Sequence, residues 1–339
     1  MKAAVQEQVG QPLAIRDVPM PGVGRRDALV RMEACGVCHS DIHLAEGFFR
    51  ALGIDVFPII PGHELVGVVE EVGEDVTHVK PGDRVGAYFF QTCGLCPHCF
   101  DGHETACATL FTGPRLSGFT VDGGYAEFVA TPAEFLLPLP DELAFEEAAP
   151  LFCGGVTAYG ALKRADVRAG QRVAILGIGG IGHMAIPIAR AMGAEVVAIT
   201  SAGKEQWARE LGADQVITRN GDVGAQLREL GGADVVLSTT IDPEDIASVQ
   251  QGLRVRGSLL VTGMTVEPLS VMPAAFAFSQ QKVIGSIIGT RRDQAELLDM
   301  AVRHRIRPVT EVYPLARANE ALERLRKQEV RLRAVLTPS

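Results

Sequence analysis

The sequence predicts an α/β protein in two parts, a β-rich first third and a doubly wound parallel sheet covered by helices. Short apolar runs cut by glycine and proline predict strands in the first third, at 29–34, 66–72, 84–86 and 125–129. From Cys153 onward, apolar strands alternate with helical stretches, which is the pattern of βαβ units around a parallel sheet. A chain of 339 residues is also long enough for two hydrophobic cores.

The order of elements after Cys153 follows from this alternation. Strands are predicted at 173–176, 196–199, 215–217, 235–237 and 259–262, and helices follow the first two of them, ending at Met192 and Leu211. The last part, from about Arg291, is predicted to form helices at 295–303 and 316–327 and an apolar run at 334–336. No internal repeat interrupts this order.

A glycine-rich turn, Leu176-Gly177-Ile178-Gly179-Gly180-Ile181-Gly182, joins the first of these strands to its helix. Glycines permit a tight turn and a close backbone approach, and the helix N-terminus offers free N–H groups to a pyrophosphate. The turn therefore predicts a dinucleotide site formed by Gly177, Gly179, Gly180, Ile181 and Gly182. The pattern is weakly specific alone, so the nature of the site depends on its surroundings.

Composition and charge restrict the possible partners. A net charge of −9, from 32 basic and 41 acidic residues, disfavours binding to nucleic acid or to an anionic membrane. The N-terminal residues lack a signal-peptide pattern, and no apolar run is long enough to span a bilayer. We therefore expect a cytoplasmic protein with a small-molecule partner, whose seven cysteines include metal ligands rather than disulfides.

The most specific local motif is Cys93-x2-Cys96-x2-Cys99-x7-Cys107. Four thiolates at short spacing can complete a tetrahedral zinc site that leaves no position open. Such a site is structural, so we expect this zinc ion to fix a loop and to take no part in chemistry.

A second set of potential ligands lies nearer the N-terminus: Cys35, Cys38, His39, Ser40, Asp41, His43, His63 and Glu64. One cysteine and one histidine far apart in sequence, with a third ligand elsewhere, would match an open catalytic zinc site. The spacing leaves Cys35 and Cys38 as alternative ligands. Cys153 is the candidate third ligand, although a lone cysteine is more often a small buried apolar residue.

Five motifs occur in the order of a known family: Cys-His-Ser-Asp at 38–41, Gly-His-Glu at 62–64, the four-cysteine lobe, Leu-Phe-Cys-Gly-Gly-Val-Thr at 151–157 and Gly-Ile-Gly-Gly-Ile-Gly-His at 177–183. The whole chain thereby resembles the zinc-dependent alcohol dehydrogenases of the medium-chain dehydrogenase/reductase superfamily, especially their bacterial and cinnamyl-alcohol-dehydrogenase-like branch. The resemblance implies a GroES-like catalytic domain at 1–152 and a Rossmann NAD(P)-binding domain at 153–290. It also implies that the segment 291–339 returns to the first domain.

The resemblance assigns metal-site roles to single residues. It implies that Cys38, His63 and Cys153 hold the catalytic zinc, and that Cys35 is a buried structural thiol. Glu64 corresponds to an outer or transient ligand of the metal. Asp41 corresponds to the residue that orients His63 through the second ring nitrogen.

The same resemblance implies hydride transfer between a nicotinamide cofactor and an alcohol or aldehyde, with zinc as the Lewis acid. Ser40 would touch the alcohol, His43 would pass its proton to solvent, and His39 would lie near the cofactor pyrophosphate. Four aromatic residues correspond to the lining of the substrate channel and favour apolar or aromatic alcohols and aldehydes: Phe48, Phe49, Tyr88 and Phe89.

The residues after the second strand of the alternating part bear on the choice of cofactor. NAD-specific relatives carry an acidic residue there for the ribose 2′-OH. Here the sequence has Thr200, Ser201 and Lys204 and no carboxylate, which suits a 2′-phosphate and favours NADP(H). Arg333 is a candidate for a cofactor phosphate contact, although it follows leucine where the family commonly has glycine.

Two other functions compete with a zinc-dependent alcohol dehydrogenase. A zinc-free quinone or enone reductase of the same superfamily should lack both cysteine-containing ligand sets, and both are present. A nucleotide-binding structural or regulatory protein should have lost its catalytic ligands, and none is lost. We therefore expect an enzyme with two zinc ions per chain. The resemblance also implies a homodimer or a homotetramer.

Overall fold

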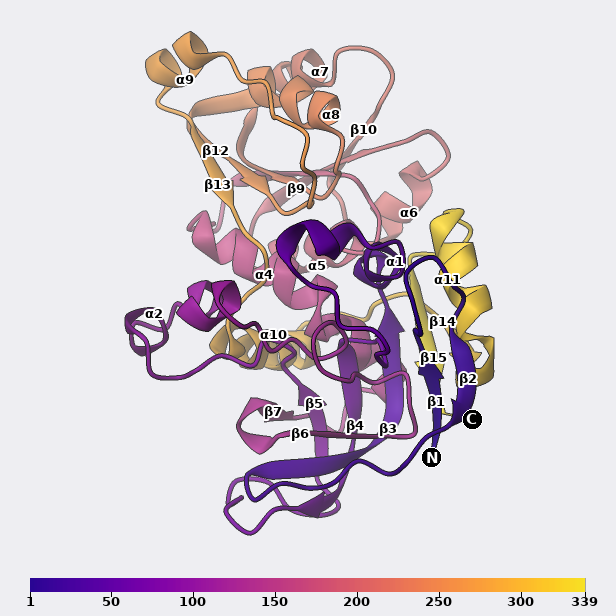
Figure 1. The fold of residues 1–339 in the computed structure, drawn as a ribbon. Helices are drawn as coiled ribbons and strands as arrows, with labels where there is room; N and C mark the ends of the chain where they lie inside the picture. The colour runs from indigo at the N-terminus through magenta and orange to yellow at the C-terminus, as the bar shows by residue number, and fades with distance from the viewer. Residues whose placement is uncertain (339) are drawn as a thin grey trace. The chain divides into compact units, whose positions relative to one another are not determined.

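The computed structural model describes residues 1–338, apart from the side chains of residues 51 and 52, and the chain divides into two compact units (Figure 1). The first unit contains Met1–Cys153, Thr290–Val302 and Arg307–Ser339. The second contains Gly154–Gly289 and Arg303–Ile306. Each unit is described separately below.

The first unit is built around a seven-stranded sheet in the order β14-β15-β3-β4-β5-β7, with β6 paired to β3. The strands are β3 (Asp27–Val37), β4 (Glu64–Val72), β5 (Arg84–Ala87), β6 (Phe128–Pro132), β7 (Leu136–Pro138), β14 (Thr310–Pro314) and β15 (Arg333–Thr337). All pairs are antiparallel except β14 with β15. A separate antiparallel ribbon joins β1 (Lys2–Val5) to β2 (Ala14–Asp17).

The core of this unit forms between β-branched and apolar side chains of the sheet strands, among them Val30, Met32, Leu65, Val69 and Val85. Burying such side chains is the main favourable term in folding, at about 25 cal/mol per Å² of apolar surface. The helices and short 3-10 turns then lie at the strand ends, and they are α1 (His39–Ala45), η1 (Phe48–Leu52), α2 (Pro97–Phe100), η2 (Glu104–Ala106), η3 (Ala108–Phe111), η4 (Ala133–Phe135), α3 (Phe145–Ala148) and η5 (Ala149–Phe152).

The C-terminal segment pairs with the N-terminal part of the chain. β15 runs antiparallel to β3, with Val335 opposite Gly36. The helix predicted at 316–327 forms as a 3-10 turn, η7 (Leu315–Arg317), followed by α11 (Ala318–Arg326), which contacts β14 and β15. Ala321 and Leu325 are four residues apart and buried on the same face of α11, which explains why the helix packs on these strands.

The second unit contains a six-stranded sheet in the order β10-β9-β8-β11-β12-β13, and every neighbouring pair is parallel. Its strands are β8 (Arg172–Leu176), β9 (Glu195–Thr200), β10 (Gln215–Thr218), β11 (Ala233–Ser238), β12 (Leu253–Val261) and β13 (Lys282–Gly285). The helical segments are α4 (Gly154–Arg164), α5 (Gly182–Ala191), α6 (Glu205–Glu210), α7 (Val223–Glu229), α8 (Pro243–Ser248), η6 (Gln250–Gly252) and α9 (Pro273–Ser279). The chain then enters α10 (Arg291–Arg303).

The order of the parallel sheet reverses between β8 and β11, because the chain first adds strands on one side of β8 and then on the other. Such a reversal places a crevice at the carboxyl ends of the two central strands, where doubly wound sheets bind their ligands. The predicted fold class, a doubly wound parallel sheet together with a β-rich domain, is confirmed.

One predicted strand begins later than expected. The strand predicted at 125–129 starts only at Phe128, because the preceding residues bond to a different segment. The N–H groups of Gly124 and Tyr125 donate to the carbonyl oxygens of Gly62 and Pro61, at 2.8 and 3.0 Å. Tyr125 is buried, and its carbonyl oxygen accepts the N–H of Ala4 in β1 at 2.8 Å, so this segment bridges β1 and residues 60–62 before it pairs with β3. No helix within residues 1–338 is long and apolar enough to cross a membrane.

Candidate functional site

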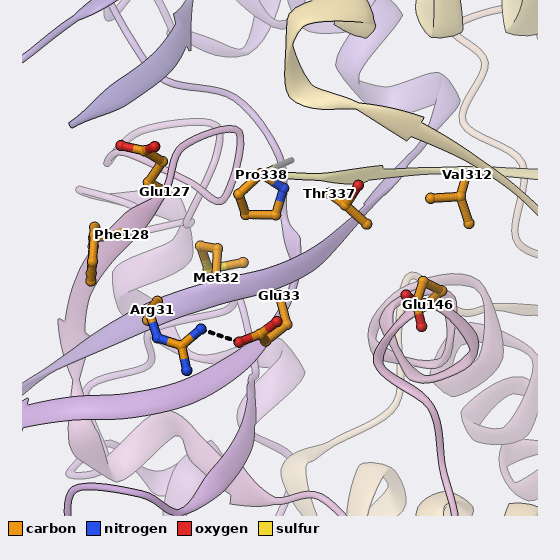
Figure 2. A pocket seen from close by; sticks show the side chains of 9 residues that line it. All are labelled: Arg31, Met32, Glu33, Glu127, Phe128, Glu146, Val312, Thr337 and Pro338. Carbon is orange, nitrogen blue, oxygen red and sulfur yellow. Dashed lines mark hydrogen bonds and ion pairs between the residues drawn. The ribbon is translucent and has the colours of Figure 1, made fainter.

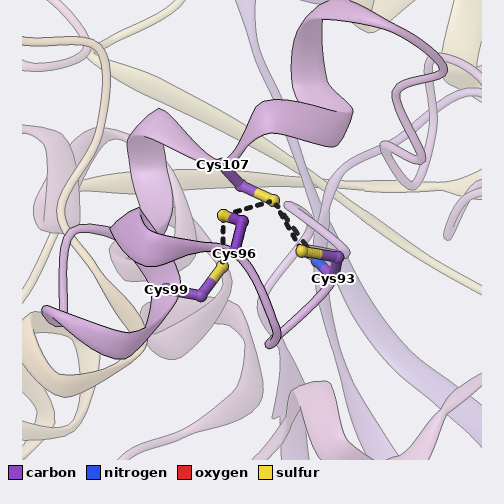
Figure 3. Close-up of side chains that lie close together, drawn as sticks. All are labelled: Cys93, Cys96, Cys99 and Cys107. Carbon is purple, nitrogen blue, oxygen red and sulfur yellow. Dashed lines mark hydrogen bonds between the residues drawn. The ribbon is translucent and has the colours of Figure 1, made fainter.

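The four cysteines of the lobe face one another in the first unit (Figure 3). The Sγ–Sγ distance is 3.6 Å between Cys96 and Cys99, 3.9 Å between Cys96 and Cys107, and 3.5 Å between Cys93 and Cys107. Sulfur atoms at about 2.3 Å from a tetrahedral zinc ion lie about 3.8 Å apart, so these separations fit Zn²⁺. The four-sulfur set leaves no coordination position for substrate.

Backbone N–H groups of the lobe donate to its sulfurs, and the effect on the pKa is largest at Cys107, whereas burial raises the pKa of Cys99 to about 12. The N–H of Cys93 donates to Sγ of Cys107 at 3.3 Å, and the N–H of Leu95 donates to Sγ of Cys93 at 3.4 Å. Burial raises the pKa of Cys107, but the N–H group of Cys93 and the hydroxyl of Thr109 outweigh burial and lower that pKa to about 6. The thiolate is the form that binds metal, so the lobe is prepared for a cation.

The lobe is anchored to α10 through Glu104, a residue that the sequence did not single out. Its buried carboxylate accepts hydrogen bonds from the backbone N–H of Arg291 at 2.6 Å and from Nε of the same residue at 2.9 Å. The two residues are 187 positions apart, so no local pattern predicts the contact. This pair fixes the lobe to the helix by which the chain re-enters the first unit.

A second group of metal-ligand side chains consists of Cys38, His63, Glu64 and Cys153, whose ligand atoms lie within 4.8 Å of one another. Strand pairing explains the first part of the group, because Gly36 of β3 lies opposite Glu64 of β4. The residues that follow β3 and precede β4 therefore meet at one end of the sheet. Cys153 reaches the same place at the end of η5.

The structure distinguishes the two cysteines that the spacing left open. Cys38 is the N-cap residue of α1, and its sulfur lies 4.0 Å from the sulfur of Cys153. Cys35 is not part of the group, and its buried sulfur lies 3.8 Å from the carbonyl oxygen of Gly36. Burial, followed by the charges of Asp41 and Glu64, raises the pKa of Cys35 well above its usual value, so it stays a neutral thiol.

Charge is arranged around the second group to receive a cation. The hydrogen bond from Cys153 lowers the pKa of Cys38 well below its usual value, with a further contribution from His63, while the pKa of Cys153 is raised. The two sulfurs therefore share one proton. Burial lowers the pKa of His63, but Asp41 and Cys38 outweigh burial and raise it to about 10. The proton on the His63 ring thus provides the positive charge that a bound metal ion would otherwise supply.

His63 presents one ring nitrogen to the group and uses the other to hold its orientation. Nδ1 lies 3.2 Å from Oδ1 of Asp41, and both side chains are buried. Nε2 is buried and has no hydrogen-bond partner among residues 1–338. Two sulfurs and one oriented imidazole nitrogen are the donors that zinc prefers, so the residues present fit a zinc ion.

Glu64 makes a buried ion pair with Arg333. One carboxylate oxygen meets the guanidinium, and the other, Oε2, has no partner within the described part of the chain. A Cβ atom at Gly36 would overlap this carboxylate, which explains the glycine in β3. The guanidinium of Arg333 therefore faces Glu64, and its predicted contact with a cofactor phosphate stays a prediction.

The predicted proton-transfer residues lie on the helix that begins at Cys38. Oγ of Ser40 lies 3.8 Å from Sγ of Cys38. His43 is half-buried, its ring centroid lies 5.0 Å from that of Phe48, and its Nδ1 has no hydrogen-bond partner in the part of the chain that is described. His39 is exposed at the start of the same helix.

Aromatic side chains surround His63. Ring centroids lie 4.9 Å from His63 for Phe89 and 4.7 Å for Phe119, and Phe119 lies 5.4 Å from Phe49. Tyr88 is fully buried behind Phe89, at 6.4 Å. Phe119 was missed from the sequence, because it lies in a loop far from both other segments. Apolar rings therefore pack directly against the imidazole of His63.

The glycine turn lies between β8 and α5 in the second unit. Gly177 adopts a φ of +91°, and its N–H donates to the carbonyl oxygen of Ile199 at 2.9 Å. A Cβ at Gly182 would overlap the carbonyl oxygen of Gly177, so the helix can begin this close to the strand only with glycine. Oγ1 of Thr239, after β11, donates to the same carbonyl at 2.9 Å. Thr239 thus links the glycine turn to the end of β11, which lies on the other side of β8 from β9. The sequence did not predict this contact.

The residues predicted to bind the 2′-phosphate of NADP(H) lie at the end of β9 and directly after it. Thr200 is the last residue of β9 and is buried, while Ser201 and the α6 N-cap residue Lys204 are half-buried. The nearest carboxylate in sequence, that of Glu205, accepts hydrogen bonds from the N–H of Gly203 at 2.7 Å and from the Thr218 hydroxyl at 3.1 Å. This carboxylate is therefore already engaged within the loop.

A surface pocket of about 480 Å³ lies apart from these groups in the first unit (Figure 2). Its polar lining includes Arg31, Glu33, Glu127 and Glu146, and Arg31 is paired with Glu33 across it. Its lining includes none of the candidate ligands described above. The pocket is thus a feature of the sheet surface and not the opening of either metal centre.

Comparison with known proteins supports the same family over the whole chain. Residues 24–141 match the alcohol dehydrogenase GroES-like domain, and residues 180–303 match the zinc-binding dehydrogenase domain. An alcohol dehydrogenase from Geobacillus stearothermophilus is 41% identical, over 99% of both chains.

Solved structures agree with the sequence relatives. The alcohol dehydrogenase of the archaeon Aeropyrum pernix is 34% identical, covers 100% of both chains and gives a TM-score of 0.91. A cobalt- and zinc-bound thermostable alcohol dehydrogenase from Pyrobaculum aerophilum is 31% identical, covers 100% of this chain and 99% of that chain, and gives a TM-score of 0.88. With both of its domains matched and its fold shared throughout, the chain belongs to the alcohol dehydrogenases of the medium-chain dehydrogenase/reductase superfamily.

Proposed function

We propose that this chain is a zinc-dependent alcohol dehydrogenase that interconverts alcohols and aldehydes or ketones with NADP(H) as the hydride carrier. The observation that carries the proposal is the convergence of Cys38, Cys153 and the unpartnered Nε2 of His63. Three protein ligands leave one coordination position for water or substrate, which is the arrangement of catalytic zinc sites. Nothing in the comparisons favours the zinc-free reductase or the non-enzymatic alternative.

The metal, when bound, supplies Lewis acidity that lowers the pKa of an alcohol or polarises a carbonyl group. The protein residues then have separate tasks. Asp41 holds the ring of His63 through Nδ1, so that Nε2 faces the two sulfurs. Ser40, whose hydroxyl lies beside Cys38, is proposed to accept the proton of an alcohol, and His43 is proposed to release it to solvent.

The aromatic side chains support a preference for apolar substrates. Phe49, Phe89 and Phe119 form a continuous set of ring contacts with His63. A polyol would leave its hydroxyl groups without partners against these rings, and unpaired polar groups are strongly disfavoured on binding. We therefore propose apolar or aromatic alcohols and the corresponding aldehydes as the substrate class.

NADP(H) is proposed over NAD(H) from the end of β9. The loop presents the hydroxyl of Ser201 and the ammonium group of Lys204, and the carboxylate of Glu205 is engaged by Gly203 and Thr218. Hydroxyl and ammonium groups suit a 2′-phosphate, whereas a free carboxylate would suit a 2′-hydroxyl.

We further propose a second, structural zinc ion in the four-cysteine lobe and a homo-oligomeric assembly. The lobe fits zinc by its sulfur separations.

The second unit leaves β13 at the edge of its sheet, beside apolar side chains that are largely exposed: Phe278 at 89%, Ile287 at 50% and Val283 at 46%. An unpaired edge strand with such neighbours favours pairing with another copy. We also propose a cytoplasmic location, because the cysteines form no disulfide within residues 1–338 and suit a reducing compartment.

The proposed function is tested by following nicotinamide absorbance with purified protein over a panel of alcohols and aldehydes, using both cofactors. We expect turnover with apolar primary alcohols and aldehydes and a higher kcat/KM with NADPH than with NADH. No turnover with any alcohol or aldehyde would contradict the reaction class. A higher kcat/KM with NADH would contradict only the cofactor preference.

A further inference from the structure

The residue Tyr125 contributes a hydroxyl to the buried side of the Cys38–His63–Cys153 group. This hydroxyl donates to Oδ2 of Asp41 at 2.8 Å, while Oδ1 of the same carboxylate lies 3.2 Å from Nδ1 of His63. The three side chains form one buried line from the tyrosine hydroxyl to the histidine ring, and none is more than 2% exposed.

Asp41 depends on these donors because no lysine or arginine pairs with it in residues 1–338. Besides the tyrosine and the histidine, its Oδ2 accepts the backbone N–H of Cys38 at 2.9 Å. A buried carboxylate that no lysine or arginine neutralises needs hydrogen-bond donors to satisfy its oxygens. The hydroxyl is a reliable donor, because burial and the charge of Asp41 raise the pKa of Tyr125 well above its usual value.

The backbone ties Tyr125 to the segment that carries His63. Three N–H groups of the 123–125 segment donate to carbonyl oxygens of residues 60–62, at distances from 2.7 to 3.0 Å. Gly62 adopts a φ of +93°, and a Cβ there would overlap the Tyr125 ring. The glycine that precedes His63 therefore makes room for the tyrosine that supports it.

We propose that Tyr125 is a positioning residue of the metal centre, acting through Asp41 to fix the tautomer and orientation of His63. This proposal deepens the proposed function and rests on its assignment of Cys38, His63 and Cys153 as ligands. Groups that hold a metal-binding histidine typically change metal affinity by about 10- to 100-fold when they are removed. Tyr125 contacts Asp41 and not His63 itself, so we expect a change in metal affinity at the lower end of that range.

The test uses Tyr125→Phe, which removes the hydroxyl and keeps the ring against Gly62. Tyr313→Phe is the matched control, because the hydroxyl of buried Tyr313 also donates to a carboxylate of the first unit, Glu311, at 2.8 Å. Zinc release from the holoprotein to a chromophoric chelator is measured together with the thermal unfolding temperature. The visible spectrum is recorded after replacement of the more labile ion by Co²⁺, since it reports on ligand geometry.

We expect Tyr125→Phe to release one of two zinc ions about tenfold faster and to shift the cobalt bands, while the second ion leaves at the parent rate. Tyr313→Phe should change neither measurement. In an Asp41→Asn background, the effect of Tyr125→Phe on release should largely disappear, because the route through the carboxylate is already broken.

Two outcomes overturn the proposal, and they differ from each other. If the parent binds two zinc ions and Tyr125→Phe leaves the release rates and the cobalt spectrum unchanged, then Tyr125 has no positioning role, even if the unfolding temperature falls. If the parent binds only the zinc ion of the four-cysteine lobe, then the proposed catalytic zinc fails and the role of Tyr125 fails with it.

Discussion

The two candidate metal centres differ in how their ligands are distributed along the chain. The lobe takes four sulfurs from residues 93–107, and the ligand cysteines Cys93, Cys96 and Cys99 are half-buried. The other centre takes two sulfurs and one nitrogen from three segments that span residues 38–153, around a buried histidine. A local, closed set can organise a loop by itself. A dispersed, incomplete set forms only after the sheet has folded, and it keeps a position for substrate.

The surroundings of the two centres differ as well. Backbone N–H groups stabilise the sulfurs of the lobe, for example that of Cys107. The dispersed centre instead has charged and polar side chains behind its ligands, namely Asp41 behind His63 and the Glu64–Arg333 ion pair beside it. On the proposed assignment, the lobe would require only a stable shape, whereas the dispersed centre would also have to control charge and protons.

The largest expected effect comes from removing a ligand of the dispersed centre. Cys38→Ser should lower kcat about a thousandfold or more, since several kcal/mol of transition-state stabilisation depend on the metal. The protein should remain folded, as judged by circular dichroism. Cys35→Ser is the matched control, because this cysteine lies three residues earlier, in β3, and outside the ligand group, and it should retain turnover. Normal turnover in Cys38→Ser would contradict the assignment of the dispersed centre as the catalytic one.

Removing a ligand of the lobe should act on stability. Cys93→Ser is expected to lower the unfolding temperature by roughly 5 to 10 °C, the change that a loss of about 3 kcal/mol gives in a domain of this size. Turnover per folded molecule should change little. His98→Ala alters a lobe residue outside the ligand group and should leave the melting curve in place. A Cys93→Ser variant with parental stability and no activity would reverse the roles assigned to the two centres.

A change in the second unit should alter catalysis without affecting either metal. Thr200→Asp places a carboxylate at the end of β9, where it would repel a 2′-phosphate and accept a ribose hydroxyl. The ratio of kcat/KM for NADPH to that for NADH should fall about 10- to 100-fold, with zinc content unchanged. Ser201→Ala is the milder comparison. An unchanged ratio in Thr200→Asp would argue against this loop as the selector of the cofactor.

The smallest effect is expected at the apolar side of the dispersed centre. Phe49→Ala should lower kcat/KM for an aromatic alcohol about tenfold, or about 1.4 kcal/mol, and change that for ethanol less. Phe100→Ala removes an aromatic residue of the lobe that is 75% exposed, and it should alter neither value. Equal losses for both alcohols in Phe49→Ala would mean that the ring supports folding and does not select substrate.

Local patterns in the sequence predicted the local features well. The four cysteines and the glycine turn are each contained in fewer than 20 consecutive residues, so spacing alone indicates the chemistry. The alternation of strands and helices after Cys153 predicted the parallel sheet for the same reason. The choice between Cys35 and Cys38 needed the direction of a side chain at the end of β3, which spacing does not contain.

The residues that the sequence missed are those that reach a site from distant loops. Tyr125 bonds to Asp41 over 84 positions, and Glu104 bonds to Arg291 over 187. Phe119 approaches His63 in the same way. Residues of these types also occur throughout the core and the surface, so the residue type alone does not indicate a place in a site. The strand predicted at 125–129 was wrong at its start because Tyr125 bonds to residues 60–62 and to Ala4 of β1, and regular pairing with β3 begins only at Phe128.

The metal content of the purified protein and two of its variants tests the central distinction most directly. We expect two zinc ions per parent chain, one in Cys38→Ser and one in Cys93→Ser, with turnover retained by folded Cys93→Ser and lost by Cys38→Ser. Fewer than two zinc ions in the fully folded parent, or loss of turnover in folded Cys93→Ser alone, would contradict the assignment of a catalytic centre and a separate structural one.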